Sequence, residues 1–228
     1  MSFLSMSPSP EIHLQEAIRL HQISDFKKGL KEAEKARKQF QKEGRIERAV
    51  EALRVMGDCT LNTHDLKKAE KIYLELLEQG VKLSSNWFQA AAYWGLGQVA
   101  SHRMDYPSAI QQFQKGLDSA NSITDKWYIA WNAFGLGNAL RGLSRVEEAQ
   151  SAYQVALRTF RDLNQVSFVT WVEKALNQIG SEAPRIGSQD EIRIWLCPLC
   201  GSKFNPDQAN ALRNGKMATC QYCGTTAG

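Results

Sequence analysis

The sequence lacks three features that would each assign it to a common class of protein. Its apolar runs are far shorter than the roughly 20 residues that cross a bilayer, so we expect no membrane association. Its first residues, MSFLSMSPSPE, have neither the basic start nor the apolar core of a secretory signal. We therefore expect a cytoplasmic protein with a disordered tail at residues 1–10. Its net charge is only +4, which by itself does not indicate nucleic-acid binding.

The common motifs of catalysis are missing as well. There is no Ser/His/Asp order in a hydrolase context and no pair of carboxylates in a recognisable cleft. The sequence GLG at 95–97 and 135–137 differs from the GxGxxG of a dinucleotide-binding loop, and no strand precedes either site in the predicted pattern. We therefore predict a protein that is not an enzyme and has no small-molecule substrate.

The sequence contains a repeat with a period of 40 residues. Related segments begin at Ser24 (SDFKKGLKEAEKA), His64 (HDLKKAEKIYLELL), Met104 (MDYPSAIQQFQKGL) and Ser144 (SRVEEAQSAYQVAL). Apolar residues recur at i, i+3 and i+4 in both halves of each unit, which is typical of helices with one buried face. Each unit is therefore predicted to be a helix, a short turn and a second helix, in an all-α fold.

Glycines inside these predicted helices need a reason, because each costs about 1 kcal/mol relative to alanine. The repeat places Gly97 opposite Ala109 and Gly137 opposite Ala149. Small residues on both sides would let the two helices of a unit approach closely. We predict that helix packing, rather than phosphate binding, is the role of these glycines.

The pattern resembles the tetratricopeptide repeat, whose usual period is 34 residues. That family places a small residue, an alanine and an aromatic at fixed positions. Here the small residues are Gly57, Gly97 and Gly137, the alanines Ala69, Ala109 and Ala149, and the aromatics Tyr73, Phe113 and Tyr153. The resemblance implies a right-handed solenoid of helix-turn-helix units over residues 11–180. The units lie near 11–43, 45–83, 85–123 and 125–163, followed by a capping helix at 167–180.

Such a solenoid has a concave face formed by the first helices of its units, and this face is the predicted binding site. Amide side chains beside aromatic rings could hold an extended peptide backbone and its apolar side chains, although packing within the core remains an alternative role for the tryptophans. The predicted groove residues are Arg54, Asp58, Asn62, Trp94, Gln98, His102, Trp131, Phe134, Asn138 and Arg141.

Four of the five cysteines form the pairs CPLCG and CQYCG near the C-terminus. Cys197, Cys200, Cys220 and Cys223 have the spacing of a four-thiolate zinc site. The segment resembles a zinc ribbon, which implies a small β-rich domain at 191–228 after a linker at 181–190. Four protein ligands leave no position for water, so the predicted zinc ion is structural. Two alternatives to zinc are an iron ion bound by the same four thiolates and a redox-active CxxC pair.

Two functions remain open from the sequence. The first is a non-enzymatic adaptor that binds a protein or peptide in the groove and presents the zinc ribbon as a second surface. The alternative is a nucleic-acid-associated factor whose ribbon contacts DNA or RNA through Lys203, Arg213 and Lys216. Residues 191–228 carry only four positive and two negative side chains, so nucleic acid is the less favoured partner.

Overall fold

The computed structural model describes residues 9–182, 204–221 and 223–227. The chain divides into two compact units, Met1–Gly180 and Ser181–Gly228, which are described separately. Most of the expected N-terminal tail, the linker at 181–190 apart from the end of the last solenoid helix, and Cys197 and Cys200 lie outside the described residues. Pro10, which was assigned to the tail, is the buried first residue of a helix.

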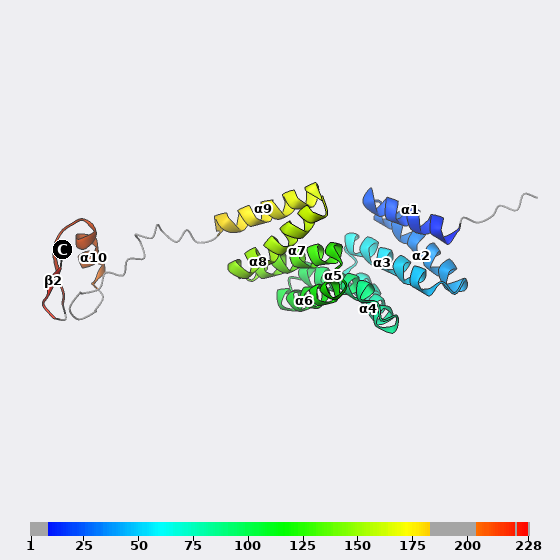
Figure 1. The fold of residues 1–228 in the computed structure, drawn as a ribbon, viewed down its shortest axis with the longest axis horizontal. Coiled ribbons are helices and arrows are strands. Elements are labelled where there is room, and N and C mark those ends of the chain that lie inside the picture. Colours follow the sequence, from blue (N-terminus) through cyan, green and yellow to red (C-terminus); the bar gives the residue numbers. More distant parts are fainter. Residues whose placement is uncertain (1–8, 183–203, 222, 228) are drawn as a thin grey trace, which may run out of the picture. The chain divides into compact units, whose positions relative to one another are not determined.

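The described part of the first unit consists of helices (Figure 1). They are α1 (Pro10–Gln22), α2 (Phe26–Lys42), α3 (Ile46–Asn62), α4 (Leu66–Lys82), α5 (Asn86–His102), α6 (Tyr106–Ser122), α7 (Lys126–Gly142), α8 (Val146–Asp162) and α9 (Val166–Glu182). From α3 to α9, each helix begins 20 residues after the start of the one before it. The pairs therefore follow the 40-residue period of the sequence. None of the described helices is both long and apolar enough to span a bilayer.

Three residues link each helix to the next, and their geometry repeats. The middle residue of every link has a positive φ, although only Gly44 is a glycine; the others are Ser24, His64, Ser84, Met104, Thr124, Ser144 and Asn164. In the first link Asp25 N–H donates to the Leu20 carbonyl at 2.8 Å and Ser24 N–H to His21 at 3.0 Å. These two bonds close the helix as a Schellman motif, and the motif turns the chain back on itself.

The turn aspartates of the repeat start the second helices. The side chains of Asp25, Asp65 and Asp105 accept hydrogen bonds from backbone N–H groups three residues further on. Each is therefore an N-cap that pairs one of the unsatisfied donors at the start of a helix. Arg145, at the same place in the fourth unit, makes no such bond.

The first helices of successive units pack against one another, since α1 contacts α3, α3 contacts α5 and α5 contacts α7. The second helices α2, α4 and α6 each pack on the first helix of their own unit and on that of the next, as α6 does on α5 and α7. The first helices therefore form one layer, and the second helices form another layer that packs against it (Figure 1).

Aromatic rings of the second helices lie nearest to the glycines of the first helices. A Cβ atom built on Gly97 would lie 2.6 Å from the ring of Phe113, and one on Gly137 would lie 2.6 Å from the ring of Tyr153. The expected approach of these glycines to Ala109 and Ala149 stays a prediction, and the rings are the nearest neighbours of the added Cβ atoms. The ring four residues further along each second helix fills the space that the missing side chain leaves.

Each ring also reaches the next unit. A Cβ on Gly95 would lie 2.2 Å from Tyr73, and one on Gly135 would lie 2.4 Å from Phe113. Tyr73 therefore lies between Gly57 and Gly95, and Phe113 lies between Gly97 and Gly135. This explains why α5 and α7 both carry the sequence GLG: its first glycine accommodates the ring of the preceding unit, and its second accommodates the ring of its own unit.

The described residues of the second unit contain one helix and one small hairpin. The helix is α10 (Pro206–Arg213), and the strands are β1 (Ala218–Thr219) and β2 (Thr226–Ala227). The strands are antiparallel, with Ala218 opposite Ala227. Phe204, Leu212, Ala218 and Cys220 form a small buried cluster. Helix outweighs strand here, which differs from the β-rich domain expected from the sequence.

Candidate binding groove

A groove of about 680 Å³ lies in the layer of first helices. We call it the tryptophan groove. It is lined by Ile18, His21, Gln22, Ser24 and Phe26 near α1, by Arg54, Val55, Asp58 and Asn62 of α3, by Trp87 and Trp94 of α5, by Trp127, Tyr128 and Trp131 of α7, and by Phe168 and Trp171 of α9. Every first helix of the solenoid thus contributes to its wall.

The groove runs obliquely across the helices. It begins at the C-terminal half of α1 and α3 and ends at the N-terminal half of α7 and α9. Residues at the same position in successive repeats therefore do not all reach it. Arg54 and Trp94 line the groove, whereas Phe134, one period further on, does not.

One end of the groove is a cluster of aromatic rings. The centroids of Trp131 and Phe168 are 4.8 Å apart, those of Trp127 and Phe168 5.8 Å, and those of Phe168 and Trp171 5.2 Å. Most of these pairs meet edge to face, which is a favourable arrangement for aromatic rings. Trp127 is 41% exposed and Trp171 is 53% exposed. The cluster thus supports its outer members while leaving them open to solvent.

The other end contains a charged network. Arg54 and Asp58 form an ion pair, and the hydroxyl of Tyr73 donates to Asp58 Oδ1 at 2.8 Å. The Arg54 guanidinium also lies 5.8 Å from the centroid of the Trp87 ring. Burial, followed by the charge of Asp58 and the hydrogen bond to it, raises the pKa of Tyr73 well above its usual value. Both oxygens of Asp58 are therefore engaged within the protein.

Arg54 keeps its charge in this network. Burial alone would lower the pKa of its guanidinium, but the charge of Asp58, assisted by Tyr128 and Glu51, holds this pKa above its usual value. The ion pair is neutral as a whole. It leaves the groove without a net positive charge at this end.

Two N–H groups of the groove-lining residues lack an acceptor among the described residues. They are Nε of Arg54 and Nε1 of Trp94, and both atoms are shielded from solvent. An unpaired buried donor costs about 1–3 kcal/mol. The groove residues therefore carry more donors than the protein itself satisfies.

Half of the predicted groove residues line the groove. Arg54, Asp58, Asn62, Trp94 and Trp131 do so; Gln98, His102, Phe134, Asn138 and Arg141 do not. Asn138 has a different partner, because its Oδ1 accepts a 2.6 Å hydrogen bond from the hydroxyl of Tyr153. Arg141 donates to Gln178 of α9. These side chains connect helices to one another.

Several groove residues were missed at the sequence level, above all Trp87, Trp127, Phe168 and Trp171. A signal for them exists in the period. Trp87 and Trp127 are one period apart, and so are Trp131 and Trp171. Tryptophans that recur at equivalent positions of first helices could have been assigned to the same face.

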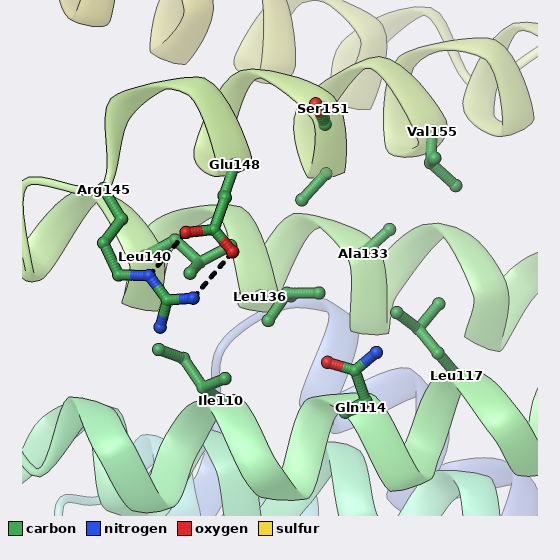
Figure 2. Close-up of a pocket in the computed structure, with 11 residues that line it drawn as sticks. Ile110, Gln114, Leu117, Ala133, Leu136, Leu140, Arg145, Glu148, Ser151 and Val155 are labelled. Carbon is green, nitrogen blue, oxygen red and sulfur yellow. Dashed lines mark hydrogen bonds and ion pairs between the residues drawn. The ribbon is translucent and has the colours of Figure 1, made fainter.

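Two smaller hollows repeat on other faces of the solenoid. The one in Figure 2 has a volume of about 340 Å³ and lies between α6, α7 and α8, with the Arg145–Glu148 ion pair at one end. A second, of about 370 Å³, is lined by α4, α5 and α6. Ile110, Leu136 and Arg145 of the first correspond, one period earlier, to Glu70, Leu96 and Asp105 of the second. They arise from the repeat itself, because the same three-helix junction recurs.

Two of the four predicted metal ligands, Cys220 and Cys223, lie among the described residues of the second unit. Cys220 and Cys223 lie in the turn of the β1–β2 hairpin. Cys220 N–H donates to the Thr225 carbonyl at 2.8 Å, and Gly224 N–H donates to the Cys220 carbonyl at 3.0 Å. Gly224 has a φ of +70°, a conformation that favours glycine. Cys220 is buried and Cys223 is exposed in this turn.

The described residues contain no group of three or more potential metal ligands. Two of the four predicted ligands, Cys197 and Cys200, lie outside the described part of the chain. The predicted four-thiolate site therefore stays a prediction, with only Cys220 and Cys223 among the described residues.

Comparison with known proteins identifies the repeat in the middle of the solenoid. Residues 88–162 match the family model described as tetratricopeptide repeat, and they cover nearly all of α5 to α8. The sequence has no match among curated proteins. Similar solved structures include MamA from Desulfovibrio magneticus RS-1, residue 41 to the end, and the MamA RS-1 ArsTM double mutant.

The likeness to these structures is limited. The first is 15% identical with a TM-score of 0.47, and the match covers 80% of this chain and 100% of that one. The second is 14% identical with a TM-score of 0.46, and the match covers 78% of this chain and 98% of that one.

Proposed function

We propose that the first unit is a non-enzymatic scaffold that holds an extended segment of a partner protein in the tryptophan groove. The observation that supports this most directly is the exposure of Trp127 and Trp171 at the end of the groove. Tryptophan is strongly enriched among the residues that dominate binding energy at protein interfaces. The match of residues 88–162 to the tetratricopeptide repeat, a family that binds protein partners, agrees with this role.

The support beneath these side chains makes them suitable for binding. Trp127 and Trp171 both contact the ring of Phe168, which in turn contacts Trp131 edge to face. The exposed rings are therefore held in place before a partner arrives. A preorganised ring loses little conformational freedom on binding, which favours affinity.

Affinity capture with the full-length chain tests the proposal. We compare wild type, the double variant Trp127→Ala/Trp171→Ala, and Val166→Ala in an extract of the native organism. Val166 is a matched control, because it lies on α9 and is 76% exposed but does not line the groove. Partners should be retained by wild type and by Val166→Ala and lost by the double variant. Equal capture by all three proteins would overturn the proposal.

For the second unit we propose a single structural zinc ion bound by Cys197, Cys200, Cys220 and Cys223. The spacing of the two CxxC pairs and the tight turn at Cys220–Gly224 support it. Zinc would contribute its binding free energy directly to the folding of this small unit. The solenoid, which is stabilised by helix packing between neighbouring units, would not depend on it.

Metal analysis of the purified protein tests the zinc proposal. Wild type should contain one equivalent of zinc, and Cys220→Ser should contain almost none. Cys59→Ala is the control, because Cys59 is buried in α3 and should leave the zinc content unchanged. A chelator should abolish the fold of the second unit with nearly unchanged helical circular dichroism. Less than about half an equivalent of zinc in wild type would overturn the proposal.

A further inference from the structure

The wall that α5, α7 and α9 contribute to the groove carries donors but almost no acceptors. Its polar side-chain atoms are the indole N–H groups of Trp87, Trp94, Trp127, Trp131 and Trp171 and the hydroxyl of Tyr128. An indole N–H can only donate a hydrogen bond. The side chains of this wall therefore suit a ligand that offers acceptors better than one that offers further donors.

The single carboxylate of the groove does not change this balance. Asp58 Oδ1 accepts from Tyr73, and Oδ2 accepts from Arg54. Arg54 Nε and Trp94 Nε1 have no acceptor in the described residues. The charged acceptor of the groove is thus already occupied, and the side-chain acceptors that remain near α1 and α3 include the neutral amides of Gln22 and Asn62.

An ordinary peptide is a poor match for such a surface, because each of its residues brings an N–H group that needs an acceptor. A prolyl residue brings a carbonyl and no N–H. Runs of proline also adopt the extended polyproline II helix without internal hydrogen bonds, and aromatic-lined grooves are a recurring binding site for that helix. Proline rings pack flat on aromatic faces, and the backbone carbonyls accept from indole N–H groups.

On the basis of the proposed function, we infer that the tryptophan groove recognises a proline-rich segment of its partner in the polyproline II conformation. Charge argues against the main alternatives. Arg54 is the only lysine or arginine that lines the groove and is paired with Asp58, so the phosphates of a nucleic acid would meet no unpaired cation of this kind. A cationic side chain of a partner would meet no unpaired carboxylate.

Fluorescence anisotropy of a labelled decaproline peptide with the full-length chain tests the inference. The matched probe is a labelled ten-residue Gly-Ser peptide, which has the same length and a donor at every residue. Decaproline should bind at least tenfold more tightly than the Gly-Ser peptide. Trp171→Ala should weaken decaproline binding at least tenfold, and Val166→Ala should leave it unchanged.

A second variant separates hydrogen bonding from ring contact. Trp171→Phe keeps an aromatic ring and removes the N–H, so it should weaken decaproline binding by an intermediate factor of roughly three to ten. The thermal melting curve of each variant, followed by helical circular dichroism, reports whether the solenoid remains folded. A ten-nucleotide oligothymidylate serves as the nucleic-acid probe and should not bind.

Two results would overturn the inference: equal affinity for decaproline and the Gly-Ser peptide, or decaproline binding that is indifferent to Trp171→Ala. Tighter binding of the oligothymidylate would replace it with nucleic-acid recognition. If the captured partner requires Trp127 and Trp171 but decaproline does not bind, the proposed scaffold function stands and only the proline-rich specificity fails.

Discussion

Aromatic side chains occupy two sets of positions in the first unit, and the two sets differ in their access to solvent. Tyr73, Phe113 and Tyr153 of the second helices are 0% exposed, whereas Trp127 and Trp171 of the first helices are 41% and 53% exposed. The first set recurs with a period of 40 residues, and each exposed tryptophan also follows another tryptophan by 40 residues, Trp127 after Trp87 and Trp171 after Trp131. Periodicity alone therefore does not distinguish a ring that stabilises the solenoid from a ring that is available to a partner.

The residues that surround each ring distinguish a ring of the core from a ring that is available to a partner. Tyr73 and Phe113 each lie between two glycines of successive first helices, which lets three helices close around one ring. The groove tryptophans instead meet other aromatic side chains edge to face. A ring enclosed by two glycines is fixed in the core, whereas a ring resting on other rings can stay partly open.

The first helix pair of the repeat departs from the pattern, and its departure supports the distinction between enclosed and exposed rings. Ala33 takes the place of the aromatic ring, and the positions equivalent to the two glycines are held by Ala17 and Val55. All three are buried. The ring and its glycines are thus lost together, and the larger side chain of Val55 provides volume that a ring provides elsewhere.

The largest effect is expected from adding a side chain beside a ring enclosed by glycines. In Gly135→Ala the new Cβ would lie 2.4 Å from the Phe113 ring, closer than atoms can approach. The ring is held from the other side by Gly97, so it has no space to retreat. We expect a loss of about 1–3 kcal/mol in the free energy of unfolding, despite the better helix propensity of alanine. Chemical denaturation measures it.

A double variant checks the cause of that loss. Phe113→Leu shortens the side chain that Gly135→Ala would clash with, so Gly135→Ala should cost less in the Phe113→Leu background than in wild type. Such a coupling between neighbouring sites is what a shared contact produces. Strictly additive losses, or a gain in stability for Gly135→Ala alone, would show that the ring is not confined as the structure indicates.

The sequence predicts the solenoid better than it predicts the groove, and the reason is physical. Helix pairs and the repeat follow from apolar periodicity and from the N-capping positions, as at Asp65, because these are local features of each unit. The groove depends on how far each unit is rotated relative to the last. That rotation moves the groove from Asp58 toward Trp127 and Trp171 and leaves Asn138 to bind Tyr153. The zinc prediction needs both CxxC pairs, and only Cys220 and Cys223 lie among the described residues.

An effect of comparable size is expected from removing the hydroxyl group of the enclosed Tyr73, and a smaller one from removing that of Tyr153. Tyr73→Phe loses a hydrogen bond to the charged Asp58, worth about 1.5–3 kcal/mol, whereas Tyr153→Phe loses one to the neutral amide of Asn138, worth about 0.5–1.5 kcal/mol. Phe113 is the natural precedent that a phenyl ring fits this space. We therefore expect Tyr73→Phe to be the more destabilising change in chemical denaturation at neutral pH. Equal losses would mean that the charge of Asp58 does not strengthen its bond.

The pH dependence of the same variant provides a check. The pKa of Tyr73 is raised above its usual value of 10.0 by burial and by Asp58, so the folded state favours the protonated phenol. That contribution to stability is fully present below pH 10.0 and is lost as the pH rises toward the folded-state pKa. Tyr73→Phe should therefore lose less stability than wild type between about pH 10 and 11.

The smallest change in stability is expected where the effect on binding is greatest. Trp171 is more than half exposed and rests on the single ring of Phe168, so Trp171→Ala removes few buried contacts and creates no closed cavity. Substitutions at such surface positions usually alter the free energy of unfolding by about 0.5 kcal/mol or less. The melting temperature of Trp171→Ala should therefore stay close to that of wild type, although the capture of a partner is weakened. A large fall in melting temperature would instead place Trp171 with Tyr73 and Phe113 among the rings that stabilise the solenoid, and the exposed end of the groove would then have no residue specialised for binding apart from Trp127.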